Sequence, residues 1–289
     1  MTNEPKTRFR LDIAYQGTDF NGWAVQPGLR TVQGELESAI ATIFRRYGAV
    51  PALIVAGRTD AGVHAVGQVA HVDLTGQQVA ALLKPRGKAV VTDAATALAR
   101  RINGILGPVP DIVLTAVTQA PEGFDARFSA MWRRYEYRVA DSLSLRDPLQ
   151  RHRTSWLPTE LDVESMDAAA MSLLGLHDFA SYCKPRDGST TIRTLQGFGW
   201  RRDPDGVLVA DVKADAFCHS MVRALVGGCV TVGEGKLRVE DLVTLRDERA
   251  RTSAFRVMPA RGLTLMQVGY PEDVGMAIRA AQTRAMRSL

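Results

Sequence analysis

The hydrophobic pattern of the first 120 residues predicts strands and helices in a regular order. Residues 8–15 alternate between apolar and polar side chains, the period of a half-buried strand. Thr31 can cap a helix. That helix carries one apolar stripe, formed by Val32, Leu36, Ile40 and Phe44. The remaining elements predicted in this half are strands at 50–56, 66–74 and 111–118 and a helix at 93–106, which gives the order βαββαβ.

The second half of the chain repeats this order. Its predicted elements are a strand at 131–140, a helix at 162–174, two strands flanking the Pro204–Gly206 turn, a helix near 219–233 and a strand at 263–270. The Asp205-Gly206 pair suits a tight hairpin between the two strands. Two copies of a split βαβ unit predict an α+β fold with two antiparallel sheets, each covered by helices on one face, and a cleft between the sheets.

Proline and glycine residues interrupt the pattern at 119–130, which predicts a domain boundary there. We therefore expect a first domain over 1–120 and a second over 121–289. The segment 75–92 is predicted to be a surface insertion, and the segment 180–191 a long polar loop. Loops of this length are either functional or mobile.

The composition narrows the class of partner. The 289 residues include 36 Lys and Arg and 31 Asp and Glu, so the net charge is +5, which is compatible with a polyanionic partner. Adjacent arginines are scattered along the chain instead of gathered in a tail, which favours a folded basic surface. The N-terminus lacks an apolar signal core and no run is long enough to span a bilayer, so we expect a cytoplasmic protein without a membrane segment.

Only three cysteines occur, at positions 183, 218 and 229, and no two are close in the sequence. The odd count and wide spacing predict neither a disulfide framework nor a cysteine zinc site. His64 and His71 match no common zinc spacing, and no Gly-rich phosphate loop is present. We therefore expect no metal and no cofactor.

The most informative motif is the nine-residue sequence GRTDAGVHA at 57–65. It places one carboxylate, Asp60, between two glycines, with Arg58 and His64 on either side. Taken alone, the motif fits an Asx-type turn as well as a catalytic carboxylate. This motif alone does not distinguish the two interpretations, so motifs in the rest of the chain are needed.

Together with other motifs, this sequence resembles the catalytic loop of the tRNA pseudouridine synthase A family. The other matching motifs follow in the family's order: Tyr15-Gln16-Gly17, Gly22-Trp23, Thr31-Val32-Gln33, Gly67-Gln68-Val69, FDARFS at 124–129, RRYEY at 133–137 and FCHSMVR at 217–223. They run from about residue 10 to residue 270, nearly the whole chain. The resemblance implies an isomerase that converts uridine to pseudouridine at positions 38, 39 and 40 of the tRNA anticodon stem-loop.

The resemblance also implies roles for four residues. Asp60 is the essential aspartate, and it attacks either ribose C1′ or uracil C6. Arg223, by pattern alone a helix-surface arginine, is the cation that keeps this carboxylate ionised in a dry pocket. Tyr135, by pattern alone a core tyrosine, packs against the uracil. Arg58 supports the extruded uridine or fills the gap that it leaves, and a salt bridge holding the loop is the alternative.

Two alternative functions were compared with the residues, and the resemblance also implies an oligomeric state. The rivals are an RNA-binding module built from two RRM-like sheets, whose aromatic signature 131–140 matches poorly, and a metal-dependent hydrolase of RNA, for which we find no clustered ligands. The family acts as a homodimer with tRNA spanning both subunits, and the helix 162–174 could supply an interface. The expected partners are therefore tRNA and a second copy of the chain.

Overall fold

In the computed structural model, residues 5–84, 93–108, 110–185 and 190–284 are described. They form two compact units, which are treated separately below. The first unit contains residues up to 61, residues 65–131 and residues from 268 onward, and the second contains residues 62–64 and 132–267. Each unit combines strands with helices, so the predicted α+β class is confirmed.

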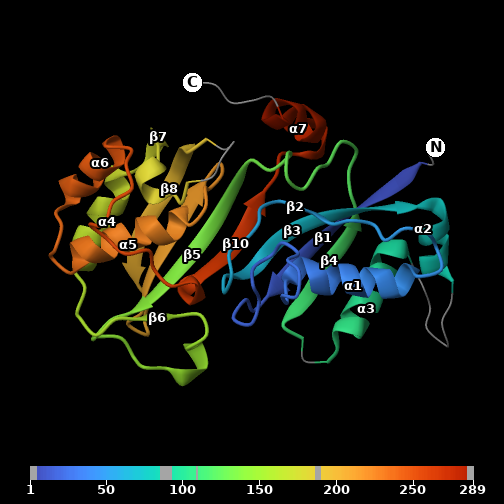
Figure 1. Cartoon of the computed structure of the whole chain (residues 1–289), viewed down its shortest axis with the longest axis horizontal. Coiled ribbons are helices and arrows are strands. Elements are labelled where there is room, and N and C mark those ends of the chain that lie inside the picture. The colour runs from blue at the N-terminus through green and yellow to red at the C-terminus, as the bar shows by residue number, and fades with distance from the viewer. Residues whose placement is uncertain (1–4, 85–92, 109, 186–189, 285–289) are drawn as a thin grey trace. The chain divides into compact units, whose positions relative to one another are not determined.

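The first unit is built on three long strands. Its elements are β1 (Lys6–Tyr15), α1 (Val32–Phe44), β2 (Ile54–Val55), β3 (His64–Thr75), α2 (Gly76–Leu83), α3 (Ala94–Leu106), β4 (Ile112–Gln119), the short η4 (Asp273–Gly275) and α7 (Met276–Arg284). The strands lie in the order β4-β1-β3, with β2 on β3, and every pair is antiparallel. Helices α1 and α3 pack against each other, and α3 packs on β4 (Figure 1).

The alternating pattern of the first strand is confirmed. Phe9, Leu11, Ile13 and Tyr15 are at most 4% exposed, whereas the residues between them are half-buried. In α1, the predicted apolar stripe is buried, and the Thr31 side chain accepts a hydrogen bond from the Gly34 backbone at 3.2 Å. Each large apolar side chain buried in this way contributes about 1.5–3 kcal/mol to the stability of the fold.

The segment 75–92, which we predicted to be a surface insertion, contains a helix. Thr75 and Gln78 form a reciprocal capping box, in which each side chain accepts a hydrogen bond from the other residue's backbone N–H, and α2 begins there. Residues 85–92 of the predicted insertion lie outside the described part of the chain.

The second unit is built on a larger sheet. Its elements are β5 (Trp132–Ala140), η1 (Pro148–Gln150), β6 (Ser155–Trp156), α4 (Val163–Ser172), β7 (Gly175–Asp178), η2 (Ala180–Tyr182), β8 (Ile192–Arg202), β9 (Leu208–Ala214), α5 (Met221–Gly233), α6 (Val239–Asp247), η3 (Ala260–Gly262) and β10 (Leu263–Gly269), whose last two residues belong to the first unit. The strands follow the order β10-β5-β9-β8-β7, and β6 pairs in parallel with β5. Helix α4 packs on β8 and contacts both α5 and α6 (Figure 1).

The hairpin between β8 and β9 has the predicted turn. Gly206 has φ +79°, and its N–H donates to the Asp203 carbonyl at 2.8 Å. Glycine adopts this left-handed conformation without a steric penalty. The segment 180–191, predicted as a loop, contains the single turn η2 and residues 186–189, which lie outside the described part.

Candidate functional site

Asp60 lies on the loop between β2 and β3, and both ends of this loop are fixed by strand pairing. Ile54 pairs with His71 and Val55 with Ala70. The N–H of Ala56 donates to the carbonyl of Val69 at 2.8 Å. The loop therefore starts from a stable sheet edge.

Within the first unit, the residue before Asp60 is held on two sides. The Thr59 hydroxyl lies 2.8 Å from the Tyr15 hydroxyl on β1, and the Thr59 carbonyl accepts the Trp23 N–H at 3.1 Å. Thr59 and Trp23 are both buried. The Asp60 side chain is half-buried and Arg58 is exposed. The carboxylate is thus carried by a backbone that is fixed at the preceding residue.

Gln68 and Tyr15 complete this support. The Gln68 side-chain amide donates to the Gly57 carbonyl at 3.0 Å and to the Tyr15 hydroxyl at 3.3 Å, and Gln68 is fully buried. Burial raises the pKa of Tyr15 to about 12, so its hydroxyl stays protonated at neutral pH and remains a hydrogen-bond donor. We define Tyr15, Thr59 and Gln68 as the loop brace.

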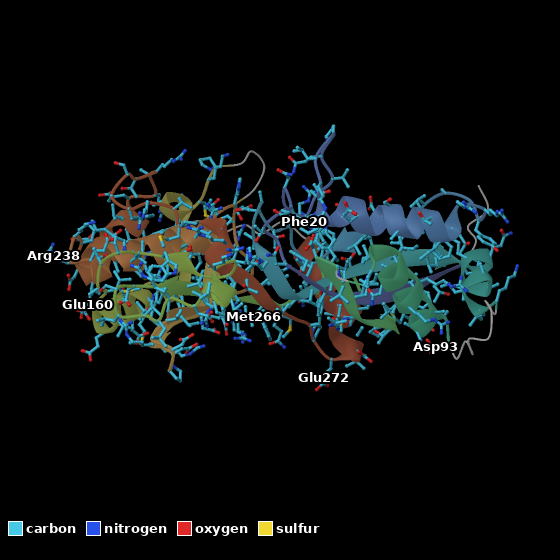
Figure 2. The ribbon with its side chains drawn as sticks, turned by 90° about the horizontal axis from the view of Figure 1, so that it is seen from below. Phe20, Asp93, Glu160, Arg238, Met266 and Glu272 are labelled. Atoms are coloured by element: carbon cyan, nitrogen blue, oxygen red, sulfur yellow. A yellow bond between two sulfur atoms is a disulfide. The ribbon has the colours of Figure 1, made fainter. Side chains whose placement is uncertain are left out.

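Gly22 lets the chain approach the loop closely. It has φ +88°, and a Cβ placed there would lie 2.9 Å from the Thr59 carbonyl oxygen. Any other residue would therefore push the turn around Trp23 away from Thr59. On the segment between Gly22 and α1, the Arg30 guanidinium lies 4.2 Å from the ring centroid of Phe20, which is labelled in Figure 2.

Residues 62–64 of the motif belong to the second unit. There, His64 is buried, and its Nε2 lies 3.2 Å from the Arg261 carbonyl oxygen. Burial lowers the pKa of His64, and the positive charge of Arg153 lowers it further, against a backbone hydrogen bond to His152 that raises it. The imidazole is therefore neutral at neutral pH, and it connects the motif to two other segments of its unit.

Tyr135 lies on β5 of the second unit. It is 8% exposed, and its ring meets the Phe217 ring edge-on at a centroid distance of 5.1 Å. Tyr135, Tyr137 and Val139 are buried on one face of the strand. Phe217 belongs to the motif that precedes α5, so two of the predicted motifs meet at this ring pair.

Arg223 lies on α5, and its Nε donates to the Met258 carbonyl at 2.6 Å. In return, the Met258 N–H donates to the Arg223 carbonyl at 3.1 Å, so the guanidinium is fixed in direction. Burial raises the pKa of the nearby Tyr137 to about 12, although the charges of Arg223, Arg261 and Arg256 lower it. These three arginines therefore create a positive region around the Tyr137 hydroxyl.

The part of the cysteine prediction that concerned disulfides was wrong. Cys183 and Cys218 form a disulfide, with their Cα atoms 5.8 Å apart, and Cys229 is a free, buried thiol. The bond ties the end of η2 to the segment that carries Phe217 and leads into α5. The two cysteines are 35 residues apart, so no local spacing could indicate the pair.

The four predicted site residues fall into two pairs. Asp60 and Arg58 share one loop of the first unit, and Tyr135 and Arg223 belong to the second unit. Sequence reasoning assigned no role to Tyr15, Thr59 and Gln68. Their signal was their presence in the motifs at 15–17, 57–65 and 67–69, which mark them without showing that they contact one another.

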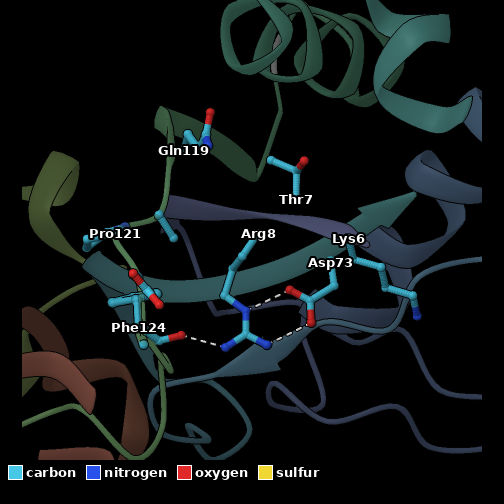
Figure 3. Close-up of a pocket in the computed structure, with 10 residues that line it drawn as sticks. Lys6, Thr7, Arg8, Asp73, Gln119, Pro121 and Phe124 are labelled. Carbon is cyan, nitrogen blue, oxygen red and sulfur yellow. Dashed lines mark hydrogen bonds and ion pairs between the residues drawn. The ribbon is translucent and has the colours of Figure 1, made fainter. Parts of the chain in front are cut away.

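A cavity of about 400 Å³ opens elsewhere in the first unit, between β1, β3 and the segment 119–124 (Figure 3). Arg8 and Asp73 form an ion pair with two hydrogen bonds in its wall, and no residue of the 57–65 loop lines it.

In the described part of the chain, no group of three or more His, Cys, Asp and Glu side chains could hold a metal ion. None of the described helices has the length and apolar character needed to cross a bilayer.

Comparison with known proteins identifies the family. A family model described as tRNA pseudouridine synthase matches residues 169–271. The tRNA pseudouridine synthase A of Leifsonia xyli subsp. xyli is 71% identical, covering 98% of both chains. The proteins of the same name from Frankia casuarinae and Mycobacterium leprae are 50% and 47% identical, covering 97% and 100% of this chain and 95% and 99% of their own length.

Among solved structures, a dye-decolorizing protein from V. cholerae aligns over 95% of this chain and 97% of its own, at 11% identity and a TM-score of 0.20, which carries no argument. The curated relatives cover nearly the whole chain at high identity, and the family model covers much of the second unit. The chain therefore belongs to the tRNA pseudouridine synthase A family of isomerases.

Proposed function

We propose that this chain isomerises uridine to pseudouridine at positions 38, 39 and 40 of the tRNA anticodon stem-loop, with Asp60 as the nucleophile. The observation that supports this role best is the loop brace. Thr59 is hydrogen-bonded through its hydroxyl to Tyr15 and through its carbonyl to Trp23, and Asp60 follows directly. A nucleophile held by rigid neighbours needs no reorganisation when the substrate arrives, which lowers the entropic part of the barrier.

The chemistry requires an ionised carboxylate and no change in oxidation state. The Asp60 carboxylate attacks ribose C1′ or uracil C6, and the glycosidic bond between N1 and C1′ breaks. The detached base turns, a new bond joins C5 to C1′, and the bond to Asp60 breaks, which regenerates the carboxylate. The proton on C5 leaves while N1 gains one. Atoms and electrons balance within the nucleotide, so the reaction is an isomerisation.

The target uridine must leave its stack before Asp60 can reach it. Extrusion of a base costs a few kcal/mol of stacking and pairing. Arg58 is exposed and precedes Asp60 by two residues, so its guanidinium can fill the gap or support the extruded nucleotide. If this role is correct, Arg58→Ala lowers the fluorescence increase of a 2-aminopurine placed beside the target uridine, whereas Arg58→Lys retains part of it.

In this proposal, Tyr135 binds the extruded uracil and Arg223 keeps the Asp60 carboxylate ionised. The Tyr135 ring stacks on the uracil, with its own edge contact to Phe217 fixing its orientation. Arg223 supplies positive charge that keeps the carboxylate ionised when water leaves, and its hydrogen bond to the Met258 carbonyl sets its direction.

The test is to map pseudouridine in unmodified tRNA transcripts after incubation with wild type, Asp60→Asn or Asp19→Asn. Asp19 is an exposed carboxylate of the same unit, so Asp19→Asn makes the same chemical change at a residue that is not part of the loop brace. We expect pseudouridine at positions 38, 39 and 40 with wild type and Asp19→Asn and none with Asp60→Asn. Pseudouridine confined to other positions would contradict the proposed site.

We also propose that the protein works in the cytoplasm as a homodimer. Three large apolar side chains, at the end of α4, just after it and on β7, support an interface: Met171, Leu174 and Leu176 are 56%, 38% and 60% exposed. The strand order places β7 at a sheet edge. Light scattering at micromolar concentration should give twice the chain mass of 31.5 kDa. A monomer mass would contradict the proposal.

A further inference from the structure

Two leucines stand exposed on a loop of the second unit. Residues 145–153, which we call the Leu149 segment, lie between β5 and β6, and Leu145 and Leu149 are 70% and 86% exposed. The Asp147 side chain accepts the Leu149 N–H at 2.8 Å, which starts the short helix η1. The leucine is thus presented by an ordered turn. Exposed apolar side chains that cluster within a polar rim mark binding sites more often than single exposed apolar side chains do.

The same segment carries positive charge that no carboxylate neutralises. Arg146, Arg151 and Arg153 are exposed, and no ion pair among the described residues involves them. The Arg146 guanidinium lies 4.3 Å from a ring centroid of Trp156, and Arg151 Nε donates to His152 at 3.2 Å.

Several arginines on the strands of the same unit are paired with acids, in contrast. Arg134 contacts Asp211 at 2.6 Å, and Arg202 contacts Asp141 at 2.8 Å. The Leu149 segment contains a single acidic residue, Asp147. The charge on the segment therefore favours an anionic partner, and its leucines favour a partner with apolar surfaces as well. A nucleic acid strand offers both, as phosphates and as base faces.

The Leu149 segment lies beside the end of the catalytic motif. A Cβ on Gly262 would lie 2.9 Å from the Ser155 Oγ, two residues after the segment, and the charge of Arg153 lowers the pKa of His64. Its Nε2 also contacts the carbonyl of Arg261, which is exposed. His64 follows Asp60 by four residues, a length of chain that spans at most about 14 Å. The chain therefore leads from the proposed nucleophile to a residue of the second unit near the segment within four residues.

We propose that the Leu149 segment binds the tRNA strand next to the target uridine. Arg151 and Arg153 contact backbone phosphates, and Leu149 packs against the sugar and base faces that extrusion exposes. Phosphate contacts set the position of the strand, and an apolar side chain can replace part of the stacking that is lost. This inference rests on the proposed function, because it assumes a tRNA substrate.

The charge contacts are tested by the full-length double variant Arg151→Ala with Arg153→Ala. Its affinity for an unmodified tRNA transcript is measured between 50 and 300 mM salt, beside wild type. Loss of two phosphate contacts on a single strand lowers the salt slope by about 1.4 and weakens binding roughly 25-fold at 0.1 M salt. The matched control, Arg45→Ala with Arg46→Ala, removes the same charge from exposed positions just after α1 and should keep both values.

The apolar contact is tested by Leu149→Ser. It should weaken binding about tenfold through lost packing, without changing the salt slope. Thermal melting of each variant confirms that it is folded.

The possible failures are distinguishable. If the double variant binds tRNA with the wild-type affinity and slope, while wild type releases tritium from C5-labelled tRNA, the Leu149 segment is not a tRNA contact and the proposed function stands. If the control double variant loses as much affinity as the test variant, the effect is one of total charge, and the inference is overturned. If wild type releases no tritium from any tRNA, the proposed function fails and the inference fails with it.

Discussion

Removal of the Tyr15 hydroxyl should disturb the 57–65 loop more than the fold. In Tyr15→Phe, the Thr59 hydroxyl loses its partner at 2.8 Å and the Gln68 amide loses one at 3.3 Å. Gln68 keeps its bond to the Gly57 carbonyl. One buried polar group left without its partner costs about 1–3 kcal/mol, which lowers the melting temperature by roughly 2–6 °C in a chain of this size.

The larger effect should appear in turnover. Thr59 directly precedes Asp60, and a misplacement of about 1 Å at a reacting group costs on the order of 100-fold in rate. We expect kcat for tritium release to fall between about tenfold and 100-fold, with the affinity for tRNA unchanged. Tyr182→Phe is the control, since its buried hydroxyl donates to the Leu242 carbonyl at 2.8 Å in the second unit. It should lose similar stability and keep its kcat.

A double-mutant cycle isolates the free energy of the hydrogen bond between Tyr15 and Thr59 from the effects of changing each residue alone. Thr59→Val leaves the Tyr15 hydroxyl with one partner fewer, and the double variant with Tyr15→Phe removes both hydroxyls. Replacing both partners by apolar groups is nearly neutral, so the double variant should be more stable than the sum of the two losses predicts. Additive losses, or a Tyr15→Phe enzyme with wild-type kcat, would refute the bracing role of Tyr15.

Two further predictions concern stability and oxidation. Burial and the charge of Arg8 lower the pKa of His71 to about 4, below its usual 6.5, so the stability it confers is complete above pH 6.5 and is lost as the pH falls toward 4. When the pH is lowered from 7.5 to 5, the free energy of unfolding measured in urea should fall by about 2 kcal/mol more for wild type than for His71→Asn. Parallel curves of unfolding free energy against pH would contradict this. The unfolded, unreduced chain should show one reactive thiol, Cys229, and three after reduction. Three thiols before reduction would contradict the bond between Cys183 and Cys218.

Much of the fold could be predicted because local patterns encode it. The alternation from Phe9 to Tyr15 and the stripe from Val32 to Phe44 each fix one buried face, and the structure buries those faces. Helix α2 was missed because Gly76 and Pro85 look like breakers, whereas the capping box of Thr75 with Gln78 begins a helix at that glycine.

Contacts between distant residues explain what the sequence could not reveal. The C-terminal residues return to the first unit, where the Tyr270 hydroxyl donates to the Ala126 carbonyl at 2.7 Å, and no local pattern indicates that return. The loop brace joins Tyr15 to Thr59 across 44 residues and to Gln68 across 53. The motif at 57–65 marked the candidate carboxylate, but only the fold shows which side chains support its loop.

The central claim is that Asp60 carries out the chemistry, and single-turnover tritium release tests it most directly. Excess enzyme would be mixed with unmodified tRNA labelled at uracil C5, at enzyme concentrations where Asp60→Asn and Asp19→Asn both bind all of the tRNA. We expect Asp19→Asn to release tritium at the wild-type rate and Asp60→Asn to release none while still binding. Release by Asp60→Asn at a rate near that of wild type would contradict the claim, because the amide cannot replace the carboxylate as a nucleophile.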